Sequence, residues 1–250
     1  SNQSAFIQQY FEGQNLQQLQ YGGSGAKKVT LSFYVKSSLT GTWGVCLQDG
    51  EAGKHNAQTY TISSANTWEY KTVTFDGDTA AGIANDNSAE FDVQFVLGAG
   101  ANYQTATTGS WQSGDKKTTS SQTQWPETNG ATWFVTGVQL ELGDTATDFE
   151  HRSYGEELAL CQRYYGRYYL HKGSEYMTHG GNISLSSNFS FPTTMRATPS
   201  STHIQNINAS NCNSSGITFV DLDGASYQVN MSVGSGTVSR RDIYAFDAEI

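Results

Sequence analysis

The chain has 250 residues and a formal net charge of −9, and only 15% of its residues are charged. A chain of this length can bury a sizeable core without metals or disulfides, as one large β-domain or two modest ones. The acidic balance disfavours nucleic acid as a partner, because nucleic-acid-binding proteins carry a basic patch or stripe. No apolar run approaches the length of a membrane-spanning segment, so we expect no membrane insertion.

Composition also bears on the redox state and on the start of the chain. The three cysteines, Cys46, Cys161 and Cys212, are odd in number and lack a close pairing pattern, which predicts reduced thiols. The sequence opens without a methionine or a signal peptide and resembles the middle of a domain, so we expect a fragment or a processed product whose first sheet is incomplete.

Short strands dominate the first part of the chain. Residues 29–36 place Leu31, Phe33 and Val35 at alternate positions, which is the period of a half-buried antiparallel strand. Further strands are predicted at residues 42–48, 60–63, 68–75, 91–97 and 132–142. Strands at this spacing, with turn residues between them, predict an all-β fold with a jelly-roll β-sandwich over residues 1–150.

A long polar segment, residues 99–130, interrupts this series of strands. A loop of this length in a compact domain is usually functional or disordered. It contains Trp111 and Trp125, and a large aromatic ring in such a loop either packs back onto the sheet or meets a partner. Packing back is the favoured alternative, and stacking against a glycan is the other.

Residues 151–168 are predicted to form a helical connector. Ser153 followed by Glu156 has the spacing of a capping box. Leu158, Cys161 and Tyr165 fall on one face at helical spacing and need a surface to cover them. A helix of about three turns is marginal alone, so it should dock on a neighbouring domain or on symmetry copies of itself.

Residues 169–250 are predicted to form a second, smaller β-domain. The predicted strands are residues 181–185, 188–191, 201–206, 216–220, 226–233 and 244–250. The expected core is small for this length, which suggests stabilisation by a partner subunit. Together with the helical stripe, this leads to the hypothesis of a homotrimer with Leu158, Cys161 and Tyr165 buried near the join between the domains.

Several segments together resemble the carbohydrate-binding-module-like jelly roll of bacteriophage tail-fibre and virion surface proteins. They are residues 13–19 (GQNLQQL), 31–38 (LSFYVKSS), 61–69 (TISSANTWE), 74–79 (TFDGDT), 85–87 (NDN) and 137–141 (GVQLE). Residues 158–165 (LALCQRYY) and 191–199 (FPTTMRATP) resemble the segment that leads to a distal C-terminal β-domain in such proteins. The resemblance implies a virion component, commonly a homotrimer, with a receptor-binding tip. The family jelly roll usually has further strands before residue 13, and none is assigned there.

No common catalytic motif is present, and the function expected is not enzymatic. A glycosidase needs only two suitably spaced carboxylates, and the candidates are Glu90, Asp92, Glu141 and Glu150. Strand-borne carboxylates are more often surface residues. The five histidines are scattered without metal-ligand spacing: His55, His151, His171, His179 and His203.

A structural calcium ion is a further hypothesis. Asp76, Asp78, Asp86 and Asn87 place hard oxygen donors in two nearby loops, as Ca²⁺ requires. Asp221 begins a truncated calcium-loop pattern that lacks the terminal glutamate. The alternative is that these Asx-rich turns form for backbone reasons alone.

Two surfaces compete for recognition of a host receptor or surface polysaccharide. One is the loop with Trp111 and Trp125. The other, which we favour, is the distal loop of residues 206–215 with its neighbours, and the candidate residues are His203, Asn206, Asn208, Asn211, Asn213 and Tyr227. The sequence therefore predicts a phage tail-fibre or virion surface protein that binds a host glycan without catalysis. The alternatives are a capsid decoration protein that binds other virion subunits, and a polysaccharide-degrading tailspike.

Overall fold

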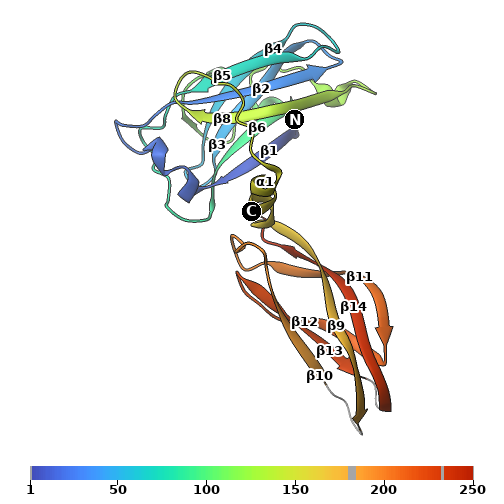
Figure 1. Ribbon diagram of the computed structural model, residues 1–250. Coiled ribbons are helices and arrows are strands. Elements are labelled where there is room, and N and C mark those ends of the chain that lie inside the picture. The colour runs from blue at the N-terminus through green and yellow to red at the C-terminus, as the bar shows by residue number, and fades with distance from the viewer. Residues whose placement is uncertain (1, 180–183, 232–233, 250) are drawn as a thin grey trace. The chain divides into compact units, whose positions relative to one another are not determined.

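In a computed structural model, the chain forms two compact units, Ser1–Glu150 and His151–Ile250 (Figure 1). The structure describes residues 2–179, 184–231 and 234–249. Both units are built from antiparallel β-sheets, which confirms the predicted all-β class.

The first unit is a sandwich of two sheets, one with the strand order β1-β6-β3-β4-β7 and one with the order β5-β2-β8. Its strands are β1 (Ser4–Glu12), β2 (Val29–Ser37), β3 (Gly41–Asp49), β4 (Lys54–Ile62), β5 (Glu69–Phe75), β6 (Ala89–Ala99), β7 (Gln112–Ser113) and β8 (Trp133–Leu142). Short 3-10 turns occupy Gly13–Asn15, Gln17–Leu19, Ala101–Tyr103 and Trp125–Glu127.

Alternation places the core of this unit between the sheets. On β2, Leu31, Phe33 and Val35 are buried, and they pack with Phe91 and Phe95 of β6. The ring centroids of Phe33 and Phe95 lie 5.0 Å apart in an edge-to-face arrangement. The predicted strands of this unit are present, and β4 begins earlier than expected, at Lys54.

One strand of the first sheet was missed. Residues before 13 were expected to leave the sheet incomplete, but β1 pairs along its length with β6. Its polar side chains, Gln8 and Gln9 among them, break the apolar alternation that identifies a strand in the sequence. The expectation that no strand lies before residue 13 is therefore wrong, and the N-terminal incompleteness of the domain stays a prediction.

The second unit contains two three-stranded sheets, β11-β14-β9 and β10-β13-β12. Its elements are α1 (Tyr154–Gln162), β9 (Tyr165–His179), β10 (Ser184–Ser190), β11 (Ser200–Ser210), β12 (Cys212–Val220), β13 (Gly224–Met231) and β14 (Gly234–Asp247). Parts of three predicted strands, residues 181–183, 232–233 and 250, lie outside the described residues.

The core of the second unit contains a cluster of aromatic rings. Phe189, Phe191 and Phe246 lie with ring centroids 5.1 to 5.5 Å apart. Tyr168 adds a fourth ring, 5.5 Å from Phe191. A few large rings thus fill the space between two narrow sheets, which agrees with the small core expected from the sequence.

The helix begins at the predicted capping box. Ser153 Oγ accepts from the backbone N–H of Glu156 at 3.3 Å, and Glu156 Oε2 accepts from the N–H of Ser153 at 2.9 Å. The connector itself is shorter than the predicted 151–168, because Tyr165 is the first residue of β9. With nine residues, α1 is also too short to cross a membrane, and no described helix is long and apolar enough to do so.

The residues of the predicted stripe are exposed. Leu158 is 40% exposed, Tyr165 is 41% exposed, and Cys161 is also exposed. Because Tyr165 lies on a strand, the three side chains do not form a single helical face. Their burial at a subunit interface stays a prediction.

Candidate functional site

The long segment at residues 99–130 is not an open loop but a strap across the outer face of the five-stranded sheet. Gln122 is buried there, where its Oε1 accepts from the N–H of Gly44 at 2.7 Å and its Nε2 donates to the carbonyl of Val96 at 3.0 Å. Val45 and Phe95 point into the core, so the residues beside them mark the opposite face of the sheet. The strap therefore covers part of this face.

Lys117 holds the middle of the strap. It is 4% exposed, and its Nζ donates to Gln48 Oε1 at 3.1 Å and to Gln94 Oε1 at 2.8 Å. Asp115 Oδ1, 2.8 Å from the same Nζ, balances its charge. A buried lysine requires such partners, and here they come from β3, β6 and the strap itself.

Trp111 and Trp125 pack back onto the core, as the favoured alternative predicted. The indole N–H of Trp111 donates to the carbonyl of Asp76 at 2.7 Å, and that of Trp125 donates to the carbonyl of Ala131 at 3.1 Å. The ring centroid of Trp111 also lies 5.9 Å from those of Tyr21 and Phe91. Both tryptophans are half-buried, and neither is displayed as a free stacking platform.

The proposed calcium residues are not assembled into a metal site. Asp78 is buried and paired with Lys54, and Asp76 pairs with Lys28 at 2.8 Å. Asp86 accepts from the N–H of Ser88 at 2.9 Å. Asn87 follows it in the same loop. Among the described residues, no three His, Cys, Asp or Glu side chains gather as metal ligands. Lysine ammonium groups balance the two aspartates that were expected to bind the ion.

The carboxylates considered for catalysis come from different parts of the first unit, except that Glu90 and Asp92 share one strand. Glu90 and Asp92 are buried on β6, Glu141 lies on β8 in the other sheet, and Glu150 is exposed. Burial raises the pKa of Asp92 to about 6, although a hydrogen bond from Gln94 and the charge of Lys117 act in the opposite direction. Glu141 Oε2 accepts a hydrogen bond from the backbone N–H of Thr147 at 3.0 Å.

In the second unit, His203 and Tyr227 converge on a buried carboxylate rather than on an open surface. Asp242 is fully buried, and its oxygens accept from Tyr227 OH at 2.5 Å, Ser215 Oγ at 2.6 Å and Arg240 Nε at 2.8 Å. His203 Nε2 lies 3.1 Å from the same group. These residues come from β11, β12, β13 and β14, so the cluster ties the two sheets together.

The prediction that Tyr227 contacts a receptor is therefore wrong, since this side chain is 1% exposed. Burial opposes the ionised form of Asp242, but hydrogen bonds from Arg240, Ser215 and Tyr227 outweigh it and lower the pKa of Asp242 to about 2. The side chain of His203 is 42% exposed, so part of it reaches solvent.

The favoured distal segment is mostly strand, and it joins the end of β11 in one sheet to the start of β12 in the other. Asn206 and Asn208 lie on β11, and Asn213 lies on β12. Asn211 forms the turn between the strands with a φ of 52°, a conformation that asparagine tolerates better than most residues. The four asparagines are exposed in this segment, and their contact with a receptor stays a prediction.

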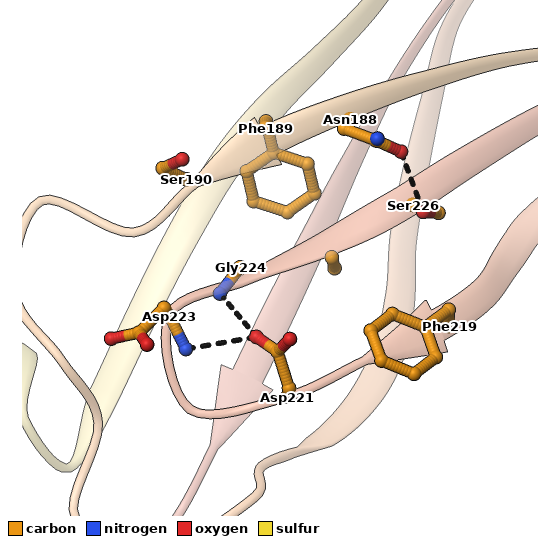
Figure 2. A pocket seen from close by; sticks show the side chains of 9 residues that line it. Asn188, Phe189, Ser190, Phe219, Asp221, Asp223, Gly224 and Ser226 are labelled. Atoms are coloured by element: carbon orange, nitrogen blue, oxygen red, sulfur yellow. Dashed lines mark hydrogen bonds between the residues drawn. The ribbon is translucent and has the colours of Figure 1, made fainter.

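A hollow of about 220 Å³ lies beside the turn between β12 and β13 (Figure 2). Asn188, Ser226 and Phe219 form a row across β10, β13 and β12, because Asn188 and Phe219 both pair with Ser226. Ala225 and Tyr227 point into the core, so this row faces outward. Phe219 is 60% exposed, and Ser226 Oγ donates to Asn188 Oδ1 at 2.6 Å.

A β-bulge decides the direction of Phe219. Strict alternation would place Ile217 and Phe219 on the same face, but the register shifts by one residue between them. Ile217 therefore pairs with inward-facing Tyr227, while Phe219 pairs with outward-facing Ser226. Val220 takes the next inward position against the core. Bulges commonly redirect a side chain next to functional sites.

Two carboxylates complete the rim of the hollow. Asp221 Oδ1 accepts from the N–H groups of Asp223 and Gly224, both at 2.9 Å, as Figure 2 shows. Asp223 Oδ1 accepts from Thr194 Oγ1 at 2.6 Å. The calcium-like pattern that begins at Asp221 is thus explained by backbone hydrogen bonding. In each carboxylate, Oδ2 has no partner among the described residues.

The sequence pattern did not reveal this hollow. Its one available signal was the pattern Asp221 to Gly224, which predicts a tight turn. The turn also requires glycine, because a Cβ at Gly224 would lie 2.3 Å from the carbonyl oxygen of Phe189. No sequence pattern indicated that the ring of Phe219 would be exposed, because an aromatic residue in a strand is ordinarily assigned to the core.

Comparisons with known proteins add little to this geometry. No family model matches the chain, and no curated protein matches its sequence. Two solved structures of discoidin II from Dictyostelium discoideum are similar to it. The recombinant protein has 8% identity and a TM-score of 0.28, covering 90% of this chain and 74% of that one. The wild-type protein has 9% identity and a TM-score of 0.23, covering 90% and 73%. A likeness at this level carries no argument about function.

Proposed function

We propose that this protein is a virion surface component of the tail-fibre type that binds a glycan of the host cell without catalysis. The binding site in this proposal is the hollow beside the β12–β13 turn. Its composition supports the proposal, since a ligand site combines an apolar surface with a few well-placed polar groups.

The observation that carries the proposal is the outward turn of Phe219. An aromatic ring that could have joined the core is instead 60% exposed beside polar groups. An exposed ring does not contribute the stabilisation that burial of its apolar surface would give the fold. A partner that covers the ring on binding would bury that surface instead. A sugar fits this arrangement, because one face of a pyranose is apolar and its edges carry hydroxyls.

The viral setting of the proposal rests on the resemblance of the sequence segments to phage fibre proteins. In that setting the chain is a homotrimer located on the virion and attached to other virion proteins. The exposure of Leu158, Cys161 and Tyr165 supports the assembly part, because these side chains remain available for an interface.

The test is binding of the whole chain to host cells and to an array of extracted bacterial surface polysaccharides. Phe219→Ala should abolish or greatly weaken binding, because it removes the stacking surface and leaves the core residues in place. Tyr169→Ala is the matched control, since Tyr169 is an aromatic residue of the same unit that is 76% exposed on the other sheet.

Three results would overturn the proposal. They are the absence of binding to every cell and polysaccharide tested, equal binding by the Phe219→Ala and wild-type chains, and release of reducing ends from a bound polysaccharide. The last result would favour a degrading tailspike.

A further inference from the structure

We propose that the hollow beside the β12–β13 turn accepts a neutral pyranose residue and rejects anionic sugars such as uronic and sialic acids. This inference rests on the proposed function and specifies the ligand class of the same site. It follows from the charge and the hydrogen-bonding capacity of the groups around Phe219.

The described charged residues that line the hollow are all acidic. Its described lining residues include Asp221 and Asp223 but no lysine, arginine or histidine. A ligand carboxylate would therefore meet two like charges without a cation to compensate them, which is unfavourable when both partners lose water. The net charge of −9 acts in the same direction at longer range.

The free hydrogen-bonding atoms match hydroxyl groups. Asp221 Oδ1 and Asp223 Oδ1 are used within the fold, so the Oδ2 atoms remain as acceptors for two ligand O–H donors. Hydrogen bonds to an ionised carboxylate are stronger than those between neutral groups. A neutral sugar supplies such donors, whereas the carboxylate of a uronic acid supplies none.

Asn188 provides the complementary donor. Its Oδ1 accepts from Ser226 Oγ, so the amide group is oriented with its NH₂ available to a ligand oxygen. Phe219 lies in the same cross-strand row and offers its face to the apolar side of the ring. The Phe219 ring, the Asn188 amide and the two carboxylates thus line one small hollow. Its size fits a single sugar residue at the end or side of a polysaccharide.

The experiment compares matched methyl glycosides on the whole chain by isothermal calorimetry and by chemical-shift perturbation. The probes are the methyl glycosides of glucose, galactose and mannose and those of the corresponding uronic acids. Each pair differs only in having CH₂OH or a carboxylate at C6. We expect at least one neutral glycoside to bind, and its uronic acid to bind about tenfold or more weakly.

The double variant Asp221→Asn with Asp223→Asn tests the carboxylates directly. Asparagine keeps the Oδ1 acceptor that the fold uses, while the change removes both charges and the two free acceptors. The variant should bind the neutral glycoside about tenfold more weakly, and the discrimination against the uronic acid should narrow. Asp247→Asn, an exposed carboxylate on β14 whose Oδ1 accepts from the N–H of Glu249, is the control and should behave as wild type.

Equal or tighter binding of the uronic acids by wild type would overturn this inference. Binding that depends on Phe219 but is unchanged in the double variant would overturn it as well, while the proposed function would stand. Failure of every neutral and anionic probe, together with failure of the polysaccharide array, would overturn both.

Discussion

Substitution of Asp242 by asparagine is expected to destabilise the second unit substantially. The asparagine side chain would keep an acceptor for Tyr227 and Ser215, but the change would remove the negative charge beside Arg240. The Arg240 side chain is only 11% exposed, so its charge would remain largely buried without a partner. Breaking a buried ion pair in this way typically costs about 3–5 kcal/mol.

The shift in the pKa of Asp242 gives a second, independent measure of how much this carboxylate stabilises the fold. Its decrease from 3.8 to about 2 corresponds to at most about 2 kcal/mol of stability, because solvent near the half-exposed His203 weakens the interaction. A loss of about 2 kcal/mol should lower the melting temperature of a unit of this size by roughly 10 °C. A depressed carboxylate pKa stabilises the fold above the unfolded pKa, so this contribution should vanish as the pH falls from about 4 to about 2.

The assay is thermal unfolding of the whole chain at about pH 7 and at about pH 2.5. All five tryptophans lie within the first unit, at positions 43, 68, 111, 125 and 133, so tryptophan fluorescence follows that unit and far-ultraviolet circular dichroism follows both. Asp247→Asn on the same strand serves as the control. The reasoning would be refuted by an unchanged circular dichroism transition at neutral pH, or by a difference from wild type that persists fully in acid.

Three further predictions concern assembly and the first unit. Light scattering at micromolar concentration should show a trimer that Leu158→Asp dissociates or unfolds; a monomeric wild-type chain would contradict this. A chelator should leave the melting temperature unchanged, because Lys54 already supplies the positive charge beside Asp78. A higher melting temperature on addition of Ca²⁺ would contradict this prediction and indicate a bound calcium ion. Asp92→Asn should stabilise the first unit more at about pH 8 than at about pH 5, because burial raises the pKa of Asp92 from 3.8 to about 6 and the resulting cost to the folded state grows as the pH rises between these two values; a reversed pH trend would refute it.

Local patterns determined the features that depend on neighbouring residues. The alternation of Leu31, Phe33 and Val35 predicted β2 and its buried face, because successive side chains of a strand point to opposite sides. Ser153 and Glu156 predicted the start of α1, because a capping box is made by residues three positions apart. The all-β class followed from the same kind of short-range information.

Long-range partners decided the rest. Whether the strap at residues 99–130 was open or packed depended on Gln122 and Lys117 meeting strands distant in sequence. The burial of Tyr227 likewise depended on Asp242, 15 positions away on another sheet. A polar residue carries no local sign of the partner that will satisfy it, so both outcomes required the tertiary structure.

The candidate site shows most clearly which features follow from the local sequence and which depend on long-range partners. The sequence by itself determined a tight turn from Asp221 to Gly224 and a β-strand before it, since both follow from local backbone preferences. Only the pairing of β12 with β13 decided that Phe219 faces outward, because the one-residue register shift after Ile217 reverses the phase of alternation. Register is a property of two strands together, and it determines whether the ring joins the core or forms a surface for a ligand.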